Sequence, residues 1–178
     1  MTKYDVNKIK AQFPALNRTV WDKPLVYLDS AASMQKPQRV LDAINKNYSF
    51  NYSNVHRGLH KLSEEATSNY EGARRKIANF INCNEKEVIF TSGATAAINL
   101  IAYSWGLKNL SPGDEIIITI AEHHANIVPW QIIAEQKDVK IIAAKINPNE
   151  DFDAKIIKEL VTDKTKIIAF PHVSNVLG

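Results

Sequence analysis

The second half of the chain alternates short apolar runs with longer stretches in which apolar residues recur at helical spacing. Apolar runs of strand length occur at residues 88–90, 115–119, 140–144 and 166–170. Helical spacing lies between them, at residues 95–105, 126–137 and 154–160. This alternation predicts right-handed strand–helix–strand crossovers, and therefore an α/β fold with a mainly parallel sheet.

The first half of the chain has a different pattern, in which helices predominate. Residues 6–13 predict a short helix that ends before Pro14, and residues 25–28 predict a short strand. Pro37 opens a further helix, whose apolar stripe contains Val40, Leu41, Ile44 and Tyr48. Ser63 is expected to cap a long helix, whose buried face contains Ala66, Tyr70, Ala73, Ile77 and Phe80. We therefore expect a helical N-terminal segment ahead of the sheet.

The composition is that of an ordinary globular protein, with 45% hydrophobic and 23% charged residues among 178. The net charge of +3 is spread thinly and the lysines do not cluster with aromatic residues, which argues against nucleic-acid binding. No apolar run approaches a membrane span, and the polar residues 1–10 lack the apolar centre of a signal peptide. The single cysteine, Cys83, excludes an internal disulfide and fits a reducing cytosol, so we expect a cytoplasmic location.

Polar residues follow three of the four expected strands, at the positions where open α/β sheets bind ligands. They are residues 92–95 (SGAT), 122–126 (EHHAN) and 172–175 (HVSN), whereas residues 145–153 after the third strand have the pattern of a plain loop. Because the carboxyl ends of parallel strands share one edge of the sheet, this spacing predicts an active site at that edge.

Residues 91–93 interrupt the first apolar run, and helical spacing begins near Thr95. A strand that turns over a glycine into a helix leaves the first helical N–H groups without intrahelical partners. The helix dipole favours an anion there, above all a phosphate, and Gly93 lets the backbone approach it closely. The same pattern also fits an ordinary turn that is capped by Thr95.

The two adjacent histidines allow several interpretations. Their imidazoles point in different directions, and either can act as a base or as a flat surface for stacking. A metal site is a rival interpretation, with His123, His124, Glu122 and His172 available as ligands. Alternatively, one histidine caps the helix that begins near Asn126 and the other is solvated.

Three other residues carry two interpretations each. Asn175 offers a donor and an acceptor, and it either holds a ligand or occupies a turn. His56 and its neighbour Arg57 form either an anion site or ordinary surface charge. Cys83 lies away from the predicted edge and has no activating partner nearby in the sequence, so we interpret it as a structural thiol.

Five blocks lie in order along nearly the whole chain: residues 27–33 (YLDSAAS) with 35–37 (QKP), 55–58 (VHRG), 91–95 (TSGAT) with Ile98 and Asn99, 122–131 (EHHANIVPWQ) and 172–178 (HVSNVLG). Together they resemble SUF-type (group II) cysteine desulfurases, and the fourth and fifth blocks are highly specific. The resemblance implies the fold type I (aspartate aminotransferase-like) architecture with pyridoxal 5′-phosphate (PLP) as cofactor. It also implies a homodimer that converts L-cysteine to L-alanine and an enzyme persulfide, whose sulfur passes to an acceptor protein for iron–sulfur cluster assembly.

The resemblance also implies roles for individual residues. Ala94 and Thr95 would hold the cofactor phosphate, and His123 would stack on the pyridine ring. Asn175 would lie beside both the cofactor and the substrate carboxylate. Ala31, Ala32 and His56 would line the substrate side, near the dimer interface. No metal is implied.

The chain departs from the family pattern in two places. Residues 94–97 (ATAA) replace the usual Thr-Thr-Glu-Gly, although Thr95 is retained. The Schiff-base lysine and the persulfide cysteine of the family come later than Gly178, so no catalytic residue is expected within the chain. We therefore expect an N-terminal portion that is inactive alone, with residues 1–60 as an N-terminal segment and residues 61–178 as an incomplete large domain. A selenocysteine lyase of the same fold and a non-catalytic remnant are the alternatives.

Overall fold

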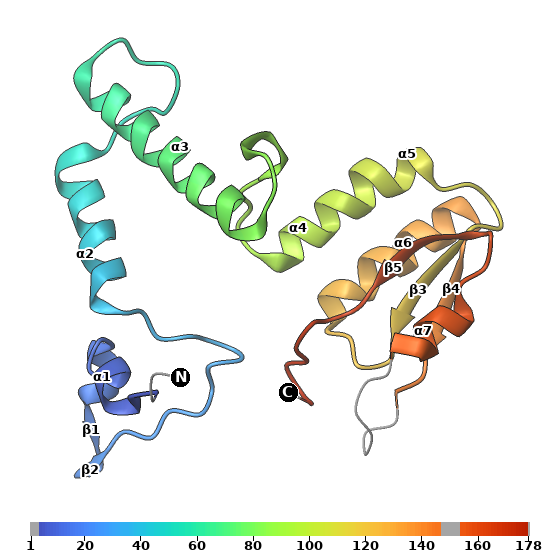
Figure 1. Ribbon diagram of the computed structural model, residues 1–178, viewed down its shortest axis with the longest axis horizontal. Helices are drawn as coiled ribbons and strands as arrows, with labels where there is room; N and C mark the ends of the chain where they lie inside the picture. The colour runs from blue at the N-terminus through green and yellow to red at the C-terminus, as the bar shows by residue number, and fades with distance from the viewer. Residues whose placement is uncertain (1–3, 147–153, 178) are drawn as a thin grey trace. The chain divides into compact units, whose positions relative to one another are not determined.

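The computed structural model describes residues 4–146 and 154–177. The chain forms two compact units, Met1–Ile89 and Phe90–Gly178 (Figure 1). Residues 147–153 of the expected loop and Gly178 of the last sequence block lie outside the described residues. The units divide after the long helix rather than at residue 60, and the assignment of residues 1–60 and 61–178 to domains of a longer enzyme stays a prediction.

The first unit is built from helices and one small hairpin. Its α-helices are α1 (Val6–Lys10), α2 (Gln38–Lys46) and α3 (Lys61–Ile81). Single turns of 3₁₀ helix span Pro14–Asn17 and Glu85–Glu87, and a π-helical turn spans Asn47–Asn51. Strands β1 (Thr19–Val20) and β2 (Lys23–Pro24) pair antiparallel. The unit therefore has the helical character that the sequence predicts.

Helix α3 begins three residues earlier than predicted, and its cap is His60 rather than Ser63. The His60 side chain accepts the Ser63 N–H at 3.4 Å. The Ser63 hydroxyl, which is buried, donates to the Asn54 carbonyl at 2.6 Å and accepts the Gly58 N–H at 3.0 Å. Ser63 thus fastens the preceding loop to the first turn of the helix.

The apolar stripes of the first unit are only partly buried. Along α2 and the π-helical turn that follows it, the exposed fraction runs from 36% at Val40 to 68% at Tyr48. On α3, Ala66 is buried as predicted. Ala73 is exposed, Ile77 is 40% exposed and Phe80 is 90% exposed, so the predicted buried face is wrong over the second half of the helix. Periodicity predicted these helices correctly, but burial also needs a second element against the stripe.

The second unit contains the parallel sheet and the helices that cover it. Helix α4 (Ala94–Ile101) continues through a π-helical turn (Ala102–Gly106) into α5 (Leu107–Asn109). The remaining elements are β3 (Glu115–Thr119), a 3₁₀ turn (His124–Asn126), α6 (Val128–Lys137), β4 (Lys140–Ala144), α7 (Ala154–Leu160) and β5 (Thr165–Ala169). Among the described residues, no helix is long and apolar enough to cross a bilayer.

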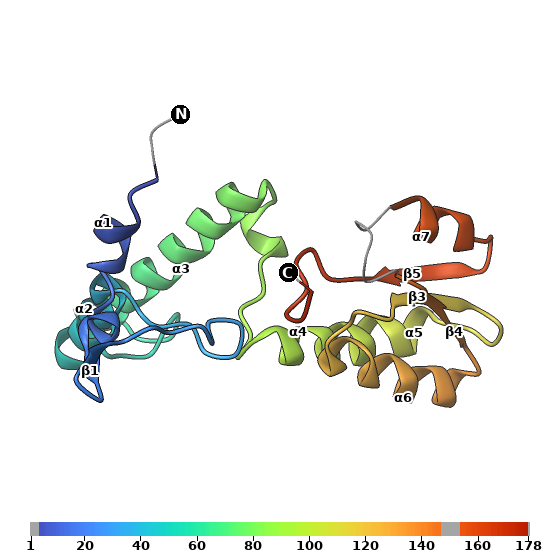
Figure 2. The ribbon, with the colours of Figure 1, turned by 90° about the horizontal axis from the view of Figure 1, so that it is seen from below.

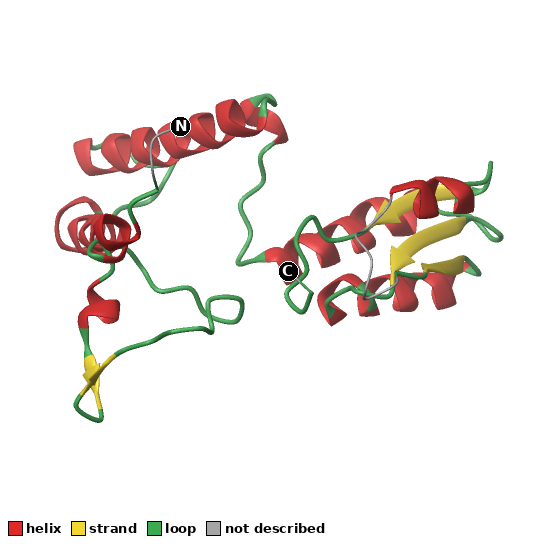
Figure 3. Cartoon of the chain, turned by 60° about the horizontal axis from the view of Figure 1, so that its bottom comes forward, coloured by secondary structure: helices red, strands yellow, loops and turns green. Residues whose placement is uncertain are grey.

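Strand β3 occupies the centre of a three-stranded sheet with the order β4-β3-β5, and it pairs in parallel with both neighbours (Figure 3). Helices α4 and α6 lie on one side of the sheet and α7 on the other (Figure 2). The β3–β5 register shifts between Glu115 and Ile116. The Thr162 hydroxyl donates to Glu115 Oε2 at 2.6 Å and fastens this irregular end.

Side chains of β3 point alternately into two hydrophobic clusters. Ile116 and Ile118 pack with Trp130 and Ile133 of α6 on one face. On the opposite face, Ile117 belongs to a cluster with Ala144 and Ile157 of α7. Each of the three β3 isoleucines is at most 5% exposed, and burying each side chain stabilises the fold by roughly 1.5–3 kcal/mol.

Most of the predicted strands and helices of the sheet are confirmed. The bounds of β3, β4 and α7 match the prediction, and β5 begins one residue early. Helix α6 begins two residues later than predicted because a 3₁₀ turn precedes it. The alternation of apolar runs and helical spacing therefore predicted all three strands of this sheet to within one residue.

The two predicted strands at residues 88–90 and 25–28 are wrong. The Val88 carbonyl accepts a hydrogen bond from the Arg74 guanidinium rather than from a strand neighbour. The β1–β2 ladder ends with the Leu25 N–H on the Arg18 carbonyl at 2.9 Å, and Leu28 beyond it is 91% exposed. An apolar run becomes a strand only where another strand supplies ladder partners.

Truncating Ile133 tests the packing of α6. Its side chain is fully buried in the cluster around Trp130, so Ile133→Ala is expected to lower the free energy of unfolding by about 2–5 kcal/mol. The adjacent Ile132 is 36% exposed, and Ile132→Ala is expected to cost below about 1 kcal/mol. Urea denaturation followed by far-UV circular dichroism measures both losses, and equal losses would contradict this core face.

Replacing glycine by alanine at two positions is expected to change the free energy of unfolding in opposite directions. Gly93 has φ 155° and ψ 177°, and a Cβ there meets no atom within 4 Å, so Gly93→Ala should cost about 1–3 kcal/mol through backbone strain alone. Gly72 lies inside α3 with equally open space, so Gly72→Ala should stabilise by about 0.5–1 kcal/mol. Thermal unfolding measures both; a neutral Gly93→Ala would remove the conformational argument for that turn.

Candidate functional site

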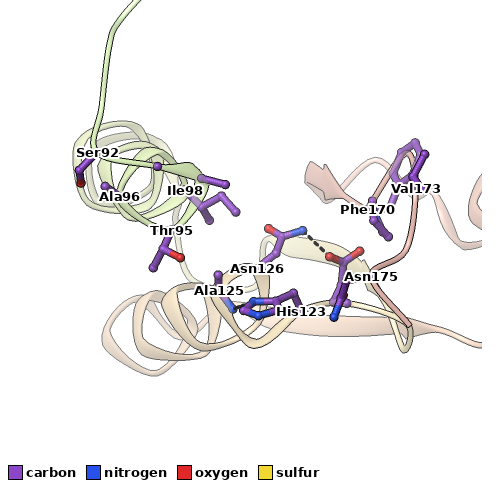
Figure 4. A pocket seen from close by; sticks show the side chains of 14 residues that line it. Ser92, Thr95, Ala96, Ile98, His123, Ala125, Asn126, Phe170, Val173 and Asn175 are labelled. Carbon is purple, nitrogen blue, oxygen red and sulfur yellow. Dashed lines mark hydrogen bonds between the residues drawn. The ribbon is translucent and has the colours of Figure 1, made fainter. Parts of the chain in front are cut away.

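A pocket of about 540 Å³ lies in the second unit, at the carboxyl ends of β3 and β5 (Figure 4). The chain leaves β3 through α6 and enters β5 from α7, on opposite faces of the sheet. Ligands of open α/β sheets bind beyond the carboxyl ends of the strands, which is where this pocket lies. The lining residues are Ser92, Gly93, Ala94, Thr95, Ala96, Ile98, Glu122, His123, Ala125, Asn126, Phe170, Pro171, Val173 and Asn175.

One wall of the pocket is the N-terminus of α4. Gly93 is the N-cap residue and no side chain caps this helix, so the alternative in which Thr95 caps the turn is wrong. The Thr91 hydroxyl donates to the Gly93 carbonyl at 3.0 Å and shapes the turn. The first N–H groups of α4 and the hydroxyl of Thr95 are therefore available to an anion.

His123 lies on the floor of the pocket and also caps the 3₁₀ turn that follows it. Its Nδ1 accepts the Ala125 N–H at 3.1 Å, which places the proton of a neutral imidazole on Nε2. The His124 ring stands at 86° to the His123 ring with centroids 6.3 Å apart, and His124 does not line the pocket. His123 therefore has both of the roles that the sequence left as alternatives: it caps the turn, and it lines the pocket.

Beneath His123, a chain of hydrogen bonds joins the sheet to α6. Glu122 Oε1 accepts the Thr119 hydroxyl at 3.0 Å, and Glu122 Oε2 accepts from Asn126 Nδ2 at 2.8 Å. Asn126 Oδ1 in turn accepts the Trp130 indole N–H at 2.9 Å. Sequence reasoning missed this chain. The four-residue spacing of residues 122, 126 and 130 was the available signal, but only Trp130 lies in α6.

The segment after β5 brings Asn175 to the pocket. The Ser174 hydroxyl accepts the N–H groups of Val176 and Leu177 at 3.2 and 3.1 Å, which holds this segment in a turn. His172 does not line the pocket. Within the described ranges, no group of three or more His, Cys, Asp or Glu side chains gathers to hold a metal ion, so the metal alternative gains no geometric support.

The structure thus brings together Ala94, Thr95, His123 and Asn175, which are the residues predicted to contact the cofactor. Their roles stay predictions. The predicted substrate-side residues Ala31, Ala32 and His56 belong to the first unit, and their relation to the pocket also stays a prediction.

Those residues of the first unit have defined local surroundings. The Tyr27 hydroxyl donates to the Ser33 carbonyl at 2.5 Å and closes the loop that contains Ala31 and Ala32. His56 has φ 68°, and its Nε2 lies 2.8 Å from Glu71 Oε1. Its imidazole is thus already paired with a carboxylate that is 15 residues away in the chain, a pairing that local sequence pattern could not predict.

Comparisons with known proteins place this chain in a family. The aminotransferase class-V model matches residues 26–178. A probable cysteine desulfurase of Vibrio cholerae is 48% identical over 98% of this chain and 43% of its own length. A probable cysteine desulfurase of Synechocystis is 46% identical over 96% of this chain and 41% of its own length. The chain therefore spans less than half the length of the relatives it matches.

Solved structures agree with the sequence comparison. A cysteine desulfurase from Thermococcus onnurineus superposes with a TM-score of 0.88 at 30% identity, over all of this chain and 43% of its own. One from Escherichia coli gives a TM-score of 0.79 at 38% identity, over 97% of this chain and 42% of its own. The predicted α/β, fold type I architecture is confirmed, and the chain belongs to the class-V aminotransferase family.

Proposed function

We propose that this chain provides the phosphate cradle and the ring-stacking histidine of a PLP-dependent cysteine desulfurase. Such an enzyme removes sulfur from L-cysteine and gives L-alanine and an enzyme persulfide. The relatives named as cysteine desulfurases support this activity. The observation that carries the proposal is the uncapped start of α4, which opens into the same pocket as His123 and Asn175.

The residues present fit a phosphate ester joined to a flat ring. The α4 N–H groups and the Thr95 hydroxyl are donors for the phosphate. His123 presents an imidazole on the pocket floor, and its Nδ1 contact with the Ala125 N–H fixes the ring orientation needed for stacking. Asn175 supplies an amide that can donate to a carboxylate. A pocket of about 540 Å³ lies within the usual range of roughly 300–1,000 Å³ for small-molecule sites.

When bound, PLP supplies an electron sink for chemistry at the substrate α-carbon. The residues of this chain bind and orient. With the cofactor bound, the dipole of α4 would stabilise the phosphate charge, and the His123 imidazole would offer a flat surface to the ring. The lysine and cysteine that perform covalent steps in the family are expected beyond Gly178.

The remaining parts of the proposal concern assembly and location. They are a homodimer with Ala31, Ala32 and His56 on the substrate side near its interface, a sulfur-acceptor protein that serves iron–sulfur cluster assembly, and a cytoplasmic location. The resemblance in residues 27–33 and 55–58 supports the first, and the single cysteine is consistent with a reducing compartment.

The phosphate cradle is tested by PLP binding to the full 178-residue chain. Thr95→Val keeps the shape of the side chain but removes a hydroxyl donor, so PLP is expected to bind about fivefold more weakly. Ser104→Ala removes a hydroxyl of the same unit outside the pocket and should leave binding unchanged. Equilibrium dialysis measures both affinities, with inorganic phosphate as competitor. Absence of PLP binding, or equal affinity of Thr95→Val and the unsubstituted chain, would contradict the proposal.

A second measurement concerns turnover. Because the Schiff-base lysine is expected beyond Gly178, the chain loaded with PLP should release no sulfide from L-cysteine and form no borohydride-reducible imine at the family's Schiff-base position. Sulfide assay and mass spectrometry after borohydride treatment check this expectation. The same assay with L-selenocysteine tests the selenocysteine lyase alternative, and turnover of either substrate would overturn the expectation of inactivity.

A further inference from the structure

We infer that Glu122 is a positioning residue that sets the His123 imidazole in the pocket, and this inference rests on the proposed function of that pocket. Both carboxylate oxygens of Glu122 accept hydrogen bonds from elements on either side of the His123 turn. The two contacts connect a turn on the surface to the buried core of the second unit.

The first contact joins Glu122 to the sheet. Oε1 accepts the hydroxyl of Thr119 at 3.0 Å, and Thr119 is the last residue of β3 and only 1% exposed. The strand itself is held by apolar packing on both faces. Glu122 Oε1 is thus fastened to the most deeply buried strand of the unit.

The second contact joins Glu122 to the 3₁₀ turn that precedes α6. Oε2 accepts from Asn126 Nδ2 at 2.8 Å, the bond drawn as a dashed line in Figure 4. Asn126 Oδ1 accepts the indole N–H of Trp130, which is 3% exposed and part of the main hydrophobic cluster. The route from Glu122 therefore reaches the core a second time.

His123 lies between these two attachments. The turn closes on itself through the Asn126 N–H on the His123 carbonyl at 2.8 Å, and the imidazole accepts the Ala125 N–H at 3.1 Å. The ring position therefore follows the position of residues 122–126. Fixing both ends of this turn fixes the plane that the imidazole presents to a ligand.

The charge of Glu122 does not account for its presence. Glu122 lines a pocket proposed to bind a phosphate ester, and its negative charge opposes an anion there. Its oxygens instead satisfy the Thr119 hydroxyl and the Asn126 amide, one of which is buried. A positioning role explains a carboxylate in this pocket, whereas an electrostatic contribution to binding does not.

The experiment compares two variants that remove the same charge. Glu122→Gln keeps the shape, accepts from Asn126 through its carbonyl oxygen and donates to the Thr119 oxygen through its amide. Glu122→Ala removes both attachments. The full 178-residue chain is used, with PLP affinity and the hydrogen-exchange rate of the Ala125 amide as readouts. Glu135→Ala, an exposed glutamate of α6, is the matched control.

Glu122→Ala is expected to weaken PLP binding about tenfold and to speed exchange of the Ala125 amide about tenfold. Glu122→Gln and Glu135→Ala should stay within about twofold of the unsubstituted chain in both readouts. If Glu122→Gln and Glu122→Ala behave alike, or if neither changes Ala125 exchange, the inference is overturned. Should Glu122→Ala not fold, Thr119→Val removes one attachment and should speed Ala125 exchange by a smaller factor.

The two readouts separate this inference from the proposed function. If the unsubstituted chain does not bind PLP, the proposed function fails, while Ala125 exchange still decides whether Glu122 sets the turn. If PLP binds and depends on His123 but Glu122→Ala binds it normally, the proposed function stands and the positioning role is wrong.

Discussion

Burial of β3 on both of its faces is the constraint from which the rest of the second unit follows. Ile116 and Ile118 pack against α6, and Ile117 belongs to the cluster that contains Ile157 of α7, so the strand cannot shift without exposing apolar surface on one side or the other. Its last residue, Thr119, is also buried, and its hydroxyl donates to Glu122. The polar residues that follow β3 therefore begin from a fixed point, and the pocket at this edge has one rigid boundary.

What the sequence predicts well is what depends on local pattern. The alternating apolar runs gave the bounds of β3, β4 and α7, and the rule that ligands bind beyond the carboxyl ends of strands selected residues 92–95, 122–126 and 172–175. Members of all three groups line the pocket. Where a structure needs a distant partner, prediction failed: residues 88–90 have a strand pattern, but the Val88 carbonyl is bound by Arg74.

The hydrogen-bond chain from Thr119 to Trp130 shows the same limit on a smaller scale. Each member has a polar side chain that sequence reasoning could assign to solvent, to a cap or to a ligand. Only the fold shows that Glu122 uses both oxygens internally while His123 beside it stays accessible. Glu122 and His123 are thus neighbours in the sequence, but the first bonds within the protein and the second faces the pocket. Residue type alone does not predict this difference.

The position of β5 at the margin of the sheet has a consequence for how the protein behaves in concentrated solution. Within the described residues, β5 pairs with β3 alone, and Ile168 on it is 43% exposed. The outward row of backbone amides and carbonyls is a template on which an extended segment of another molecule can add by forming a new ladder. Strand addition at the outer edge of β5 is therefore a route by which copies of this chain can associate, and the small net charge opposes it only weakly.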